Sequence, residues 1–230
     1  MKQIITAFVS LVLITSAVGA DIRITEYMYR GAVDSSSNRE REFIELTNIG
    51  SVPIDMDGWS FDDDKRTPGI FDLSSFGIVM PGESVIITET TVERFRDEWS
   101  LDMSIKIIGD LGNPTGNNLG RADEINIYDA LGILVDRLTY GDEVFPGSIR
   151  TDGASGWVSQ AGLGMNDPYE WTLSSIGDMQ NSWAALSGDI GSPGVHVIPE
   201  PAALLLLAGG LMVCNRRRPA NRVTTDSKAK

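Results

Sequence analysis

Side chains suited to catalysis are scarce in this sequence. It holds one histidine, His196, which falls in an apparent linker, and one cysteine, Cys214, within an apolar run. This inventory argues against a Ser-His-Asp or Cys-His site and against a zinc site built on imidazoles. Carboxylates are so abundant that any pair of them says nothing specific about acid–base chemistry. We therefore expect a protein that is not an enzyme. The alternative is a hydrolase or lyase that uses Asp and Glu, assisted by calcium.

The densest acidic cluster surrounds Gly58 and raises the question of a calcium site. An EF-hand loop requires Glu at its twelfth position, and counting from Asp55 places Arg66 there. A loop of a β-sandwich can still hold Ca²⁺ through carboxylates and backbone carbonyls. The candidate ligands are Asp62, Asp63 and Asp64. A solvated acidic turn is the alternative that we favour.

Three tryptophans form a second group of candidate binding residues. Trp157, Trp171 and Trp183 lie among glycines and serines. Exposed indoles in such a setting can stack on sugar rings, so the group suggests carbohydrate binding. Large aromatic side chains are usually mostly buried, so we favour the alternative that these three close one end of the fold.

The charge balance bears on the class of partner. Between Asp21 and Ile198 the sequence has 12 Lys and Arg against 30 Asp and Glu, which gives 12 − 30 = −18. So acidic a body repels phosphate backbones, and we expect no nucleic-acid partner. The same charge suits solubility, and cation binding, outside the cell.

The first 20 residues read as a secretory signal peptide. Lys2 is followed by the apolar run Ile4–Ile14, and small residues precede a cut after Ala20. Signal peptidase is thus an expected processing partner, and the remaining chain is expected to be exported.

The C-terminal end, residues 198–218, reads as a sorting tail. Pro199, Glu200 and Pro201 precede a 13-residue apolar segment, 202–214, and a basic cluster follows it. That segment is short against the ~20 residues that cross a bilayer comfortably, but snorkelling arginines extend its reach. The cluster is Arg216, Arg217 and Arg218. It predicts a cytoplasmic C-terminal side, with the segment anchored in the inner membrane. A polar stretch, 219–230, ends the chain.

The body between these ends, residues 21–197, reads as one all-β domain. Alternating apolar residues predict strands at Ile22–Met28, Glu42–Leu46, Val52–Met56, Ser84–Thr88, Glu124–Tyr128 and Ile133–Tyr140. The last two flank Gly132 and predict a hairpin. In the first strand, alternation places Ile22, Ile24 and Met28 on one face and Tyr27 on the other.

One short helix interrupts the strands. Thr90 and Glu93 fit a capping box, and Val92, Phe95 and Trp99 follow helical spacing. We expect this apolar stripe to pack against the core.

The ordered blocks of the body resemble a lamin-tail domain. They are IRITE (22–26), EFIELTN (42–48), VPIDMDGWSF (52–61), MPGESVIIT (80–88) and DEINIYDALGILVDRLTYG (123–141). The resemblance covers residues 21–142, with a looser part at 143–197, and Ser192-Pro193-Gly194 is similar to the family's closing turn. It implies an immunoglobulin-like β-sandwich that binds or tethers, with no catalytic set to carry over.

The tail resembles a PEP-CTERM signal, which exosortases recognise. That resemblance implies cleavage near Pro199-Glu200-Pro201 and transfer of the body to the cell surface or to its exopolysaccharide. The twelve residues after Arg218 depart from such tails, which usually end sooner, and a plain membrane anchor is the alternative. We therefore expect a non-catalytic surface or extracellular-matrix protein. An accessory carbohydrate-binding module and a self-associating shell protein remain open.

Overall fold

The computed structural model describes residues 21–31, 41–111 and 116–197, which lie within the compact unit Met1–Val197. The predicted signal peptide and sorting tail lie outside the described residues. Along the described part of the chain, neither helix is long and apolar enough to cross a membrane.

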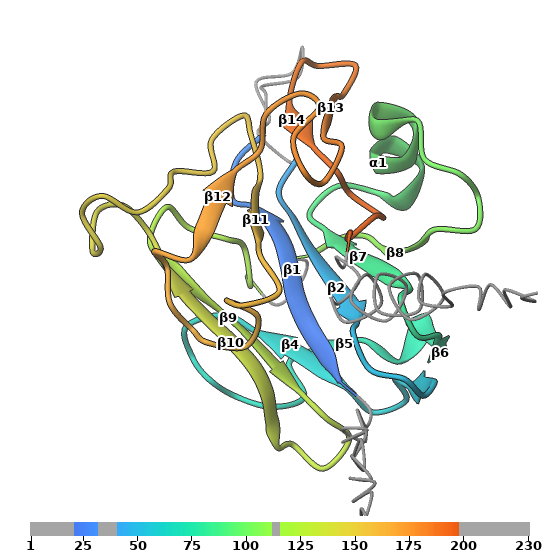
Figure 1. Cartoon of the computed structure of the whole chain (residues 1–230). Helices are drawn as coiled ribbons and strands as arrows, with labels where there is room; N and C mark the ends of the chain where they lie inside the picture. Colours follow the sequence, from blue (N-terminus) through green and yellow to red (C-terminus); the bar gives the residue numbers. More distant parts are fainter. Residues whose placement is uncertain (1–20, 32–40, 112–115, 198–230) are drawn as a thin grey trace, which may run out of the picture. The chain divides into compact units, whose positions relative to one another are not determined.

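Two β-sheets form the body (Figure 1). The larger sheet has the strand order β12-β11-β1-β2-β7-β8. Its strands are β12 (Trp171–Leu173), β11 (Gly156–Val158), β1 (Ile22–Met28), β2 (Phe43–Asn48), β7 (Ser84–Thr88) and β8 (Lys106–Ile108). The smaller sheet has the order β10-β9-β4-β5. Its strands are β10 (Leu134–Tyr140), β9 (Asp123–Tyr128), β4 (Ser60–Asp62) and β5 (Phe71–Asp72).

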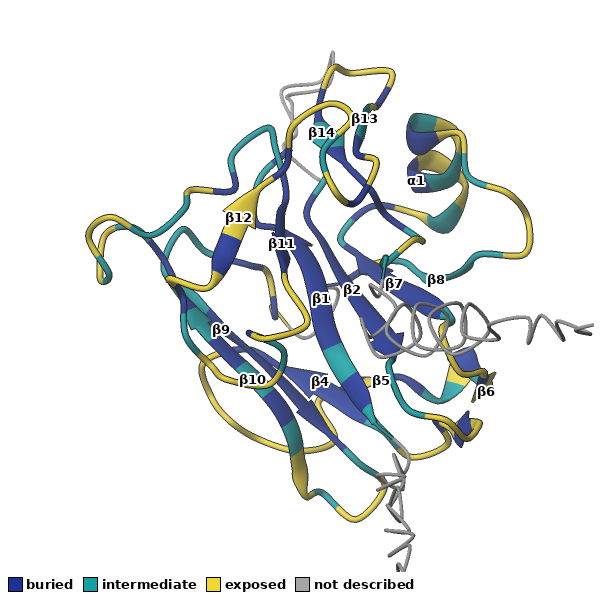
Figure 2. Cartoon of the chain, viewed as in Figure 1, coloured by how far each residue is buried: buried dark blue, intermediate teal, exposed yellow. Residues whose placement is uncertain are grey.

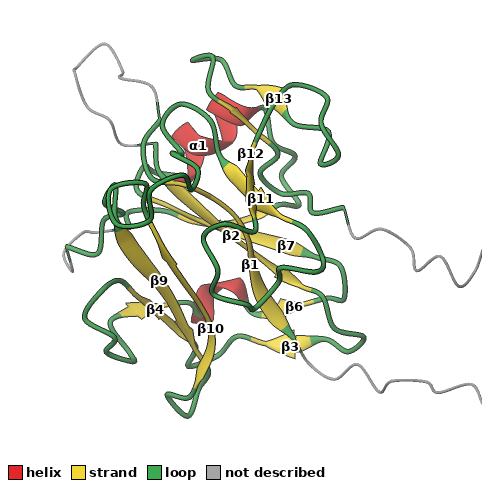
Figure 3. Ribbon diagram, turned by 60° about the vertical axis from the view of Figure 1, so that its left-hand side comes forward, coloured by secondary structure: helices red, strands yellow, loops and turns green. Residues whose placement is uncertain are grey.

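Two short ribbons and two helices complete the fold. The ribbons pair β3 (Ile54–Asp55) with β6 (Ile78–Val79), and β13 (Trp183–Ala184) with β14 (Ile190–Gly191). The helices are the 3-10 turn η1 (Ser74–Phe76) and α1 (Val92–Trp99). Figure 3 shows the two sheets as separate layers, with α1 beside β13. The mostly-β architecture is consistent with an immunoglobulin-like sandwich.

The main core lies between the two sheets. Ile24 and Leu46 of the larger sheet and Ile127 of the smaller one belong to a single buried apolar cluster. A second cluster covers the opposite face of the larger sheet, where Phe43 meets Phe95 and Trp99 of α1 at ring distances of 5.5 and 5.8 Å. Strands β1, β2 and β7 are therefore buried along nearly their whole length (Figure 2).

A β-bulge in β1 overturns the predicted assignment of its faces. Ile24 pairs with Leu46 but Glu26 pairs with Glu45, so Thr25 is an extra residue. One extra residue reverses the alternation beyond it. Tyr27 consequently joins the main core, and Met28 joins the second cluster.

Two elements begin later in the structure than the sequence predicts. The N-cap of α1 is Thr91, whose hydroxyl accepts from the Arg94 amide at 3.3 Å, so the capping box at Thr90 is wrong by one residue. The third strand is only Ile54–Asp55, and Val52 outside it is 44% exposed. Pro53 has no N–H to donate to a neighbouring strand, which accounts for the late start of β3.

The hairpin of β9 and β10 is confirmed, with Gly132 at φ +72°.

Candidate functional site

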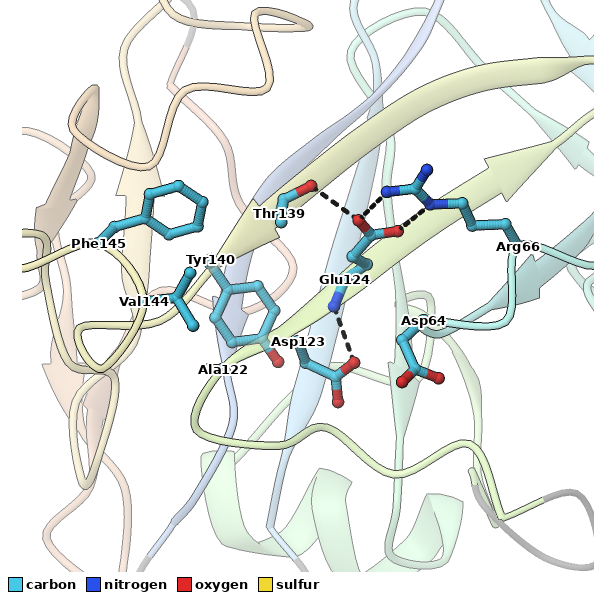
Figure 4. A pocket seen from close by; sticks show the side chains of 9 residues that line it. All are labelled: Asp64, Arg66, Ala122, Asp123, Glu124, Thr139, Tyr140, Val144 and Phe145. Atoms are coloured by element: carbon cyan, nitrogen blue, oxygen red, sulfur yellow. Dashed lines mark hydrogen bonds and ion pairs between the residues drawn. The ribbon is translucent and has the colours of Figure 1, made fainter.

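A surface pocket of about 240 Å³ opens where β9 begins and β10 ends (Figure 4). The loop after β4 forms one wall, the paired strand ends form the floor, and the segment after β10 forms the other wall. Its lining residues are Asp64, Arg66, Ala122, Asp123, Glu124, Thr139, Tyr140, Val144 and Phe145.

The polar wall is organised by an ion pair. Arg66 donates to both carboxylate oxygens of Glu124, from Nε at 2.7 Å and from Nη2 at 2.5 Å, and Thr139 adds a third donor at 3.1 Å (Figure 4). The hydrogen bond from Arg66 outweighs burial and lowers the pKa of Glu124 to about 2. Glu124 is therefore ionised and already paired, which makes it a poor general base.

Asp123 is the more buried of the two pocket carboxylates, Asp64 and Asp123, for which the described residues show no ion pair. Its oxygens accept from the backbone amides of Glu124 at 2.8 Å and Gly120 at 2.7 Å. Within the described residues no Lys or Arg pairs with it. Burial, together with the charges of Asp63 and Asp64, raises the pKa of Asp123. A positively charged ligand beside Asp123 would stabilise its ionised form and so lower its pKa again.

The other wall is apolar. Val144 is 63% exposed, and Phe145 stands edge-on to Tyr169 with ring centroids 6.4 Å apart. Tyr140 is buried behind them; its hydroxyl donates to the Gly120 carbonyl and its ring packs 4.5 Å from Tyr27. Tyr140 therefore packs as part of the core.

The whole lining has a negative charge. With Asp64, Asp123 and Glu124 against Arg66, it carries −3 + 1 = −2 beside an aromatic edge. Such a lining suits a small group that carries positive charge.

The sequence pattern of the Lamin Tail Domain matches residues 15–142, more than half of the chain. The chain belongs to the Lamin Tail Domain family. No curated protein and no solved structure matches it. The family consists of immunoglobulin-like domains without catalytic function. The lamin-tail match includes the polar wall of the pocket but ends before Val144 and Phe145.

The lamin-tail fold does not gather the predicted calcium ligands. Asp62 is fully buried and accepts from the Thr67 amide at 2.6 Å and from the Asn117 side chain at 3.1 Å. Asp63 faces Lys65 at 3.7 Å. Asp64 lines the pocket instead. In the described ranges no three His, Cys, Asp or Glu side chains are placed to hold a metal ion.

The three tryptophans serve as packing residues. Trp157 and Trp171 are each 7% exposed; Trp171 packs edge-on to Tyr27, and Trp157 donates to Asp178 at 3.0 Å. Trp183 packs against Trp99, 5.9 Å away. Trp157 and Trp171 are thus nearly covered, whereas Trp183 is partly buried. The predicted processing residues (Ala20, Pro199, Glu200, Pro201, Arg216, Arg217 and Arg218) lie outside the described residues.

Sequence reasoning missed two buried carboxyl groups. Glu26 and Glu45 face each other across β1 and β2 and are 1% and 0% exposed. Burial raises the pKa of Glu26 to about 7, and burial with the charge of Glu26 raises the pKa of Glu45 to about 8. A glutamate in each of two adjacent apolar strands was the available signal, but the bulge that brings the two into register cannot be read from alternation.

Proposed function

We propose that this lamin-tail protein is an exported, non-catalytic binding module that acts at the cell surface or in the extracellular matrix. Family membership supports the binding role, and the sequence of the two ends supports export. The observation that carries the proposal is the occurrence, on one chain, of a lamin-tail sandwich and the ordered Pro-Glu-Pro, apolar and arginine elements.

In this proposal the two ends determine delivery. Signal peptidase cuts after Ala20, and the apolar segment 202–214 holds the body at the inner membrane. An exosortase then cleaves near Pro199-Glu200-Pro201 and passes the body to the surface or to the exopolysaccharide.

The test of delivery is mass spectrometry of both ends of the protein recovered from cells. We expect a surface or matrix form that begins at Asp21 and ends close to Glu200. Intact polypeptide in the cytosol would overturn export. A membrane form that keeps residues 202–230 would overturn sorting by cleavage.

We further propose that the pocket beside Phe145 is the ligand contact of the module. Its charge and aromatic edge favour exopolysaccharides with free amino groups over those rich in uronic acid. At about 240 Å³ it is smaller than the ~300–1,000 Å³ of pockets for drug-sized ligands, so it fits one amino-sugar unit rather than an oligosaccharide.

The binding test titrates the full chain with a glucosamine polymer and with a uronic acid polymer. We expect Phe145→Ala to weaken binding of the amino polymer about fivefold or more, since a cation–π contact and apolar area are both lost. The matched control is Ile133→Ala, which removes an exposed apolar side chain at the hairpin turn, away from the pocket. Equal binding by both variants would mean that the acidic surface attracts the polymer without using the pocket, and would overturn the assignment.

A further inference from the structure

Two carboxyl groups lie under the last described segment of the chain. Glu26 of β1 and Glu45 of β2 are directly opposite each other, on the sheet face that also carries the second apolar cluster. Like charges placed opposite each other on one face of a sheet destabilise it. The fold nevertheless buries both side chains almost completely.

The segment 190–197, which we call the closing segment, supplies hydrogen bonds to both groups. Ser192 donates to Glu26 from its amide and from its hydroxyl, each at 2.8 Å. The Gly194 amide donates to Glu45 at 2.6 Å. A Cβ added at Gly191 would lie 2.9 Å from the Glu26 carboxylate, so the segment is in direct contact with the group. In Figure 1 it runs from β14 down toward β7.

The remaining partners of the pair are neutral hydroxyls. Ser155 donates to Glu26, and Thr25 donates to Glu45 at 2.7 Å. In the described part of the chain, no Lys or Arg forms an ion pair with either group. The charged neighbour that acts on Glu26 is Asp178, another acid. Two carboxylates without a cation cannot both be ionised at low cost in this environment.

We propose that Glu26 and Glu45 form a proton-controlled latch, which holds the closing segment against the larger sheet while protonated and loosens it when both groups ionise. Ionisation places two negative charges in a dry site. Water can reach them by displacement of Ser192 and Gly194, the residues that cover them. The closing segment leads toward Pro199, so the latch acts on the stretch of chain that precedes the proposed cleavage motif.

The direction of the pH effect follows from the shifts. Both groups have folded pKa values above the ordinary value of 4.5, so the closed form binds more protons than an open form. The segment is therefore held most firmly at low pH and loosens as pH rises toward about 8. Other ionisable groups lie in or beside this region, among them Arg41 and Glu98, which pair with each other at 3.0 Å. Asp189, bonded by the Ser187 hydroxyl at 3.1 Å, precedes the segment, and the pKa of His196 is lowered to about 4 by burial. His196 is thus neutral throughout the range from about pH 6 to 8.5.

The test is hydrogen exchange of the full chain, followed by mass spectrometry and corrected for the intrinsic effect of pH. We expect the opening equilibrium of peptides that contain Ser192 and Gly194 to rise about tenfold or more between about pH 6 and 8.5. The Glu26→Gln/Glu45→Gln double variant is neutral at every pH and should show less than about a threefold change.

The matched control is Glu42→Gln. Glu42 is a third buried glutamate whose pKa is raised well above its ordinary value by burial, but it accepts from the Leu119 amide, outside the closing segment. This variant should keep the pH response at Ser192 and Gly194. Unchanged or stronger protection at high pH in the wild type would overturn the latch, as would a response that persists in the double variant.

A second measurement covers the case in which the double variant fails to fold. Infrared difference spectra of the wild type should show a signal of protonated carboxyl groups at about pH 6 that falls by more than about half by about pH 8.5. Glu45→Gln alone should remove part of that signal. A wild type whose buried carboxyl groups are all ionised at the lower pH would overturn the proposal.

Discussion

Arg66 and Glu124 show how one side chain sets the charge state of another at the pocket. We predict that Arg66→Gln raises the pKa of Glu124 by about one unit or more, because the chief cause of its depression is removed. A carboxyl group with a depressed folded pKa adds stability above its unfolded pKa, and that stability is lost as pH falls from about 4.5 to 2. The Arg66→Gln variant should therefore be less stable than the wild type at neutral pH and equally stable near pH 2. Side-chain NMR titration and urea unfolding measure the two effects.

The control for that prediction is Arg121→Gln. Arg121 pairs with Asp142 at 2.6 Å and with Glu143 at 2.8 Å, so its loss removes a surface cation and leaves Glu124 with its own partner. A Glu124 pKa that shifts equally in both variants would mean that general surface charge, rather than the direct hydrogen bonds, sets its ionisation.

At the scale of elements, the end of β10 depends on a glycine. Gly141 has φ +127°, and a Cβ there would lie 2.4 Å from the Ala122 Cα and 2.6 Å from the Arg121 carbonyl. Both contacts are with backbone, which cannot move aside as a flexible side chain can. We predict that Gly141→Ala lowers the free energy of unfolding by more than about 2 kcal/mol and distorts the adjoining pocket.

Gly147→Ala separates backbone strain from this close approach. Gly147 also has a positive φ, +95°, but a Cβ placed there would have no atom within 4 Å, so the substitution should cost only the strain of about 1 kcal/mol. Urea unfolding of both variants measures the difference. Equal losses would show that conformation alone, and not the contact with Ala122, fixes the strand end.

Elements with strong local signals were predictable from the sequence. The hairpin at Gly132 and the strand Ser84–Thr88 were both found, because alternation and turn residues agree there. The faces of β1 were not, since the bulge at Thr25 is fixed by pairing with β2 and has no local signature. The pocket was missed for the same reason: Asp64 was noticed only as part of an acidic run, and its approach to Asp123 depends on the pairing of β4 with β9.

At the scale of the whole molecule, buried carboxyl groups should make stability fall as pH rises. Glu26, Glu42 and Glu45 each have raised pKa values, so the folded state binds more protons than the unfolded state above about pH 4.5. His196 acts in the opposite sense between about 4 and 6.5, since its folded pKa is depressed by burial. The two effects partly cancel below pH 6.5, and only the carboxyl effect remains above it.

We therefore predict that the free energy of unfolding falls by about 2 kcal/mol between about pH 6.5 and 8, at a slope of up to about 1.4 kcal/mol per pH unit for each group. Urea unfolding of the full chain measures it. Repulsion among the many surface carboxylates is not the cause, because these are already ionised at neutral pH, and about 0.5 M salt should screen surface charges while it leaves the fall in place. The Glu26→Gln/Glu45→Gln variant should lose most of the pH dependence. If the stability of the wild type were constant or rose over this interval, the buried pair would have to be ionised in the folded protein, and the closing segment would be held by charge-assisted hydrogen bonds instead of by protons.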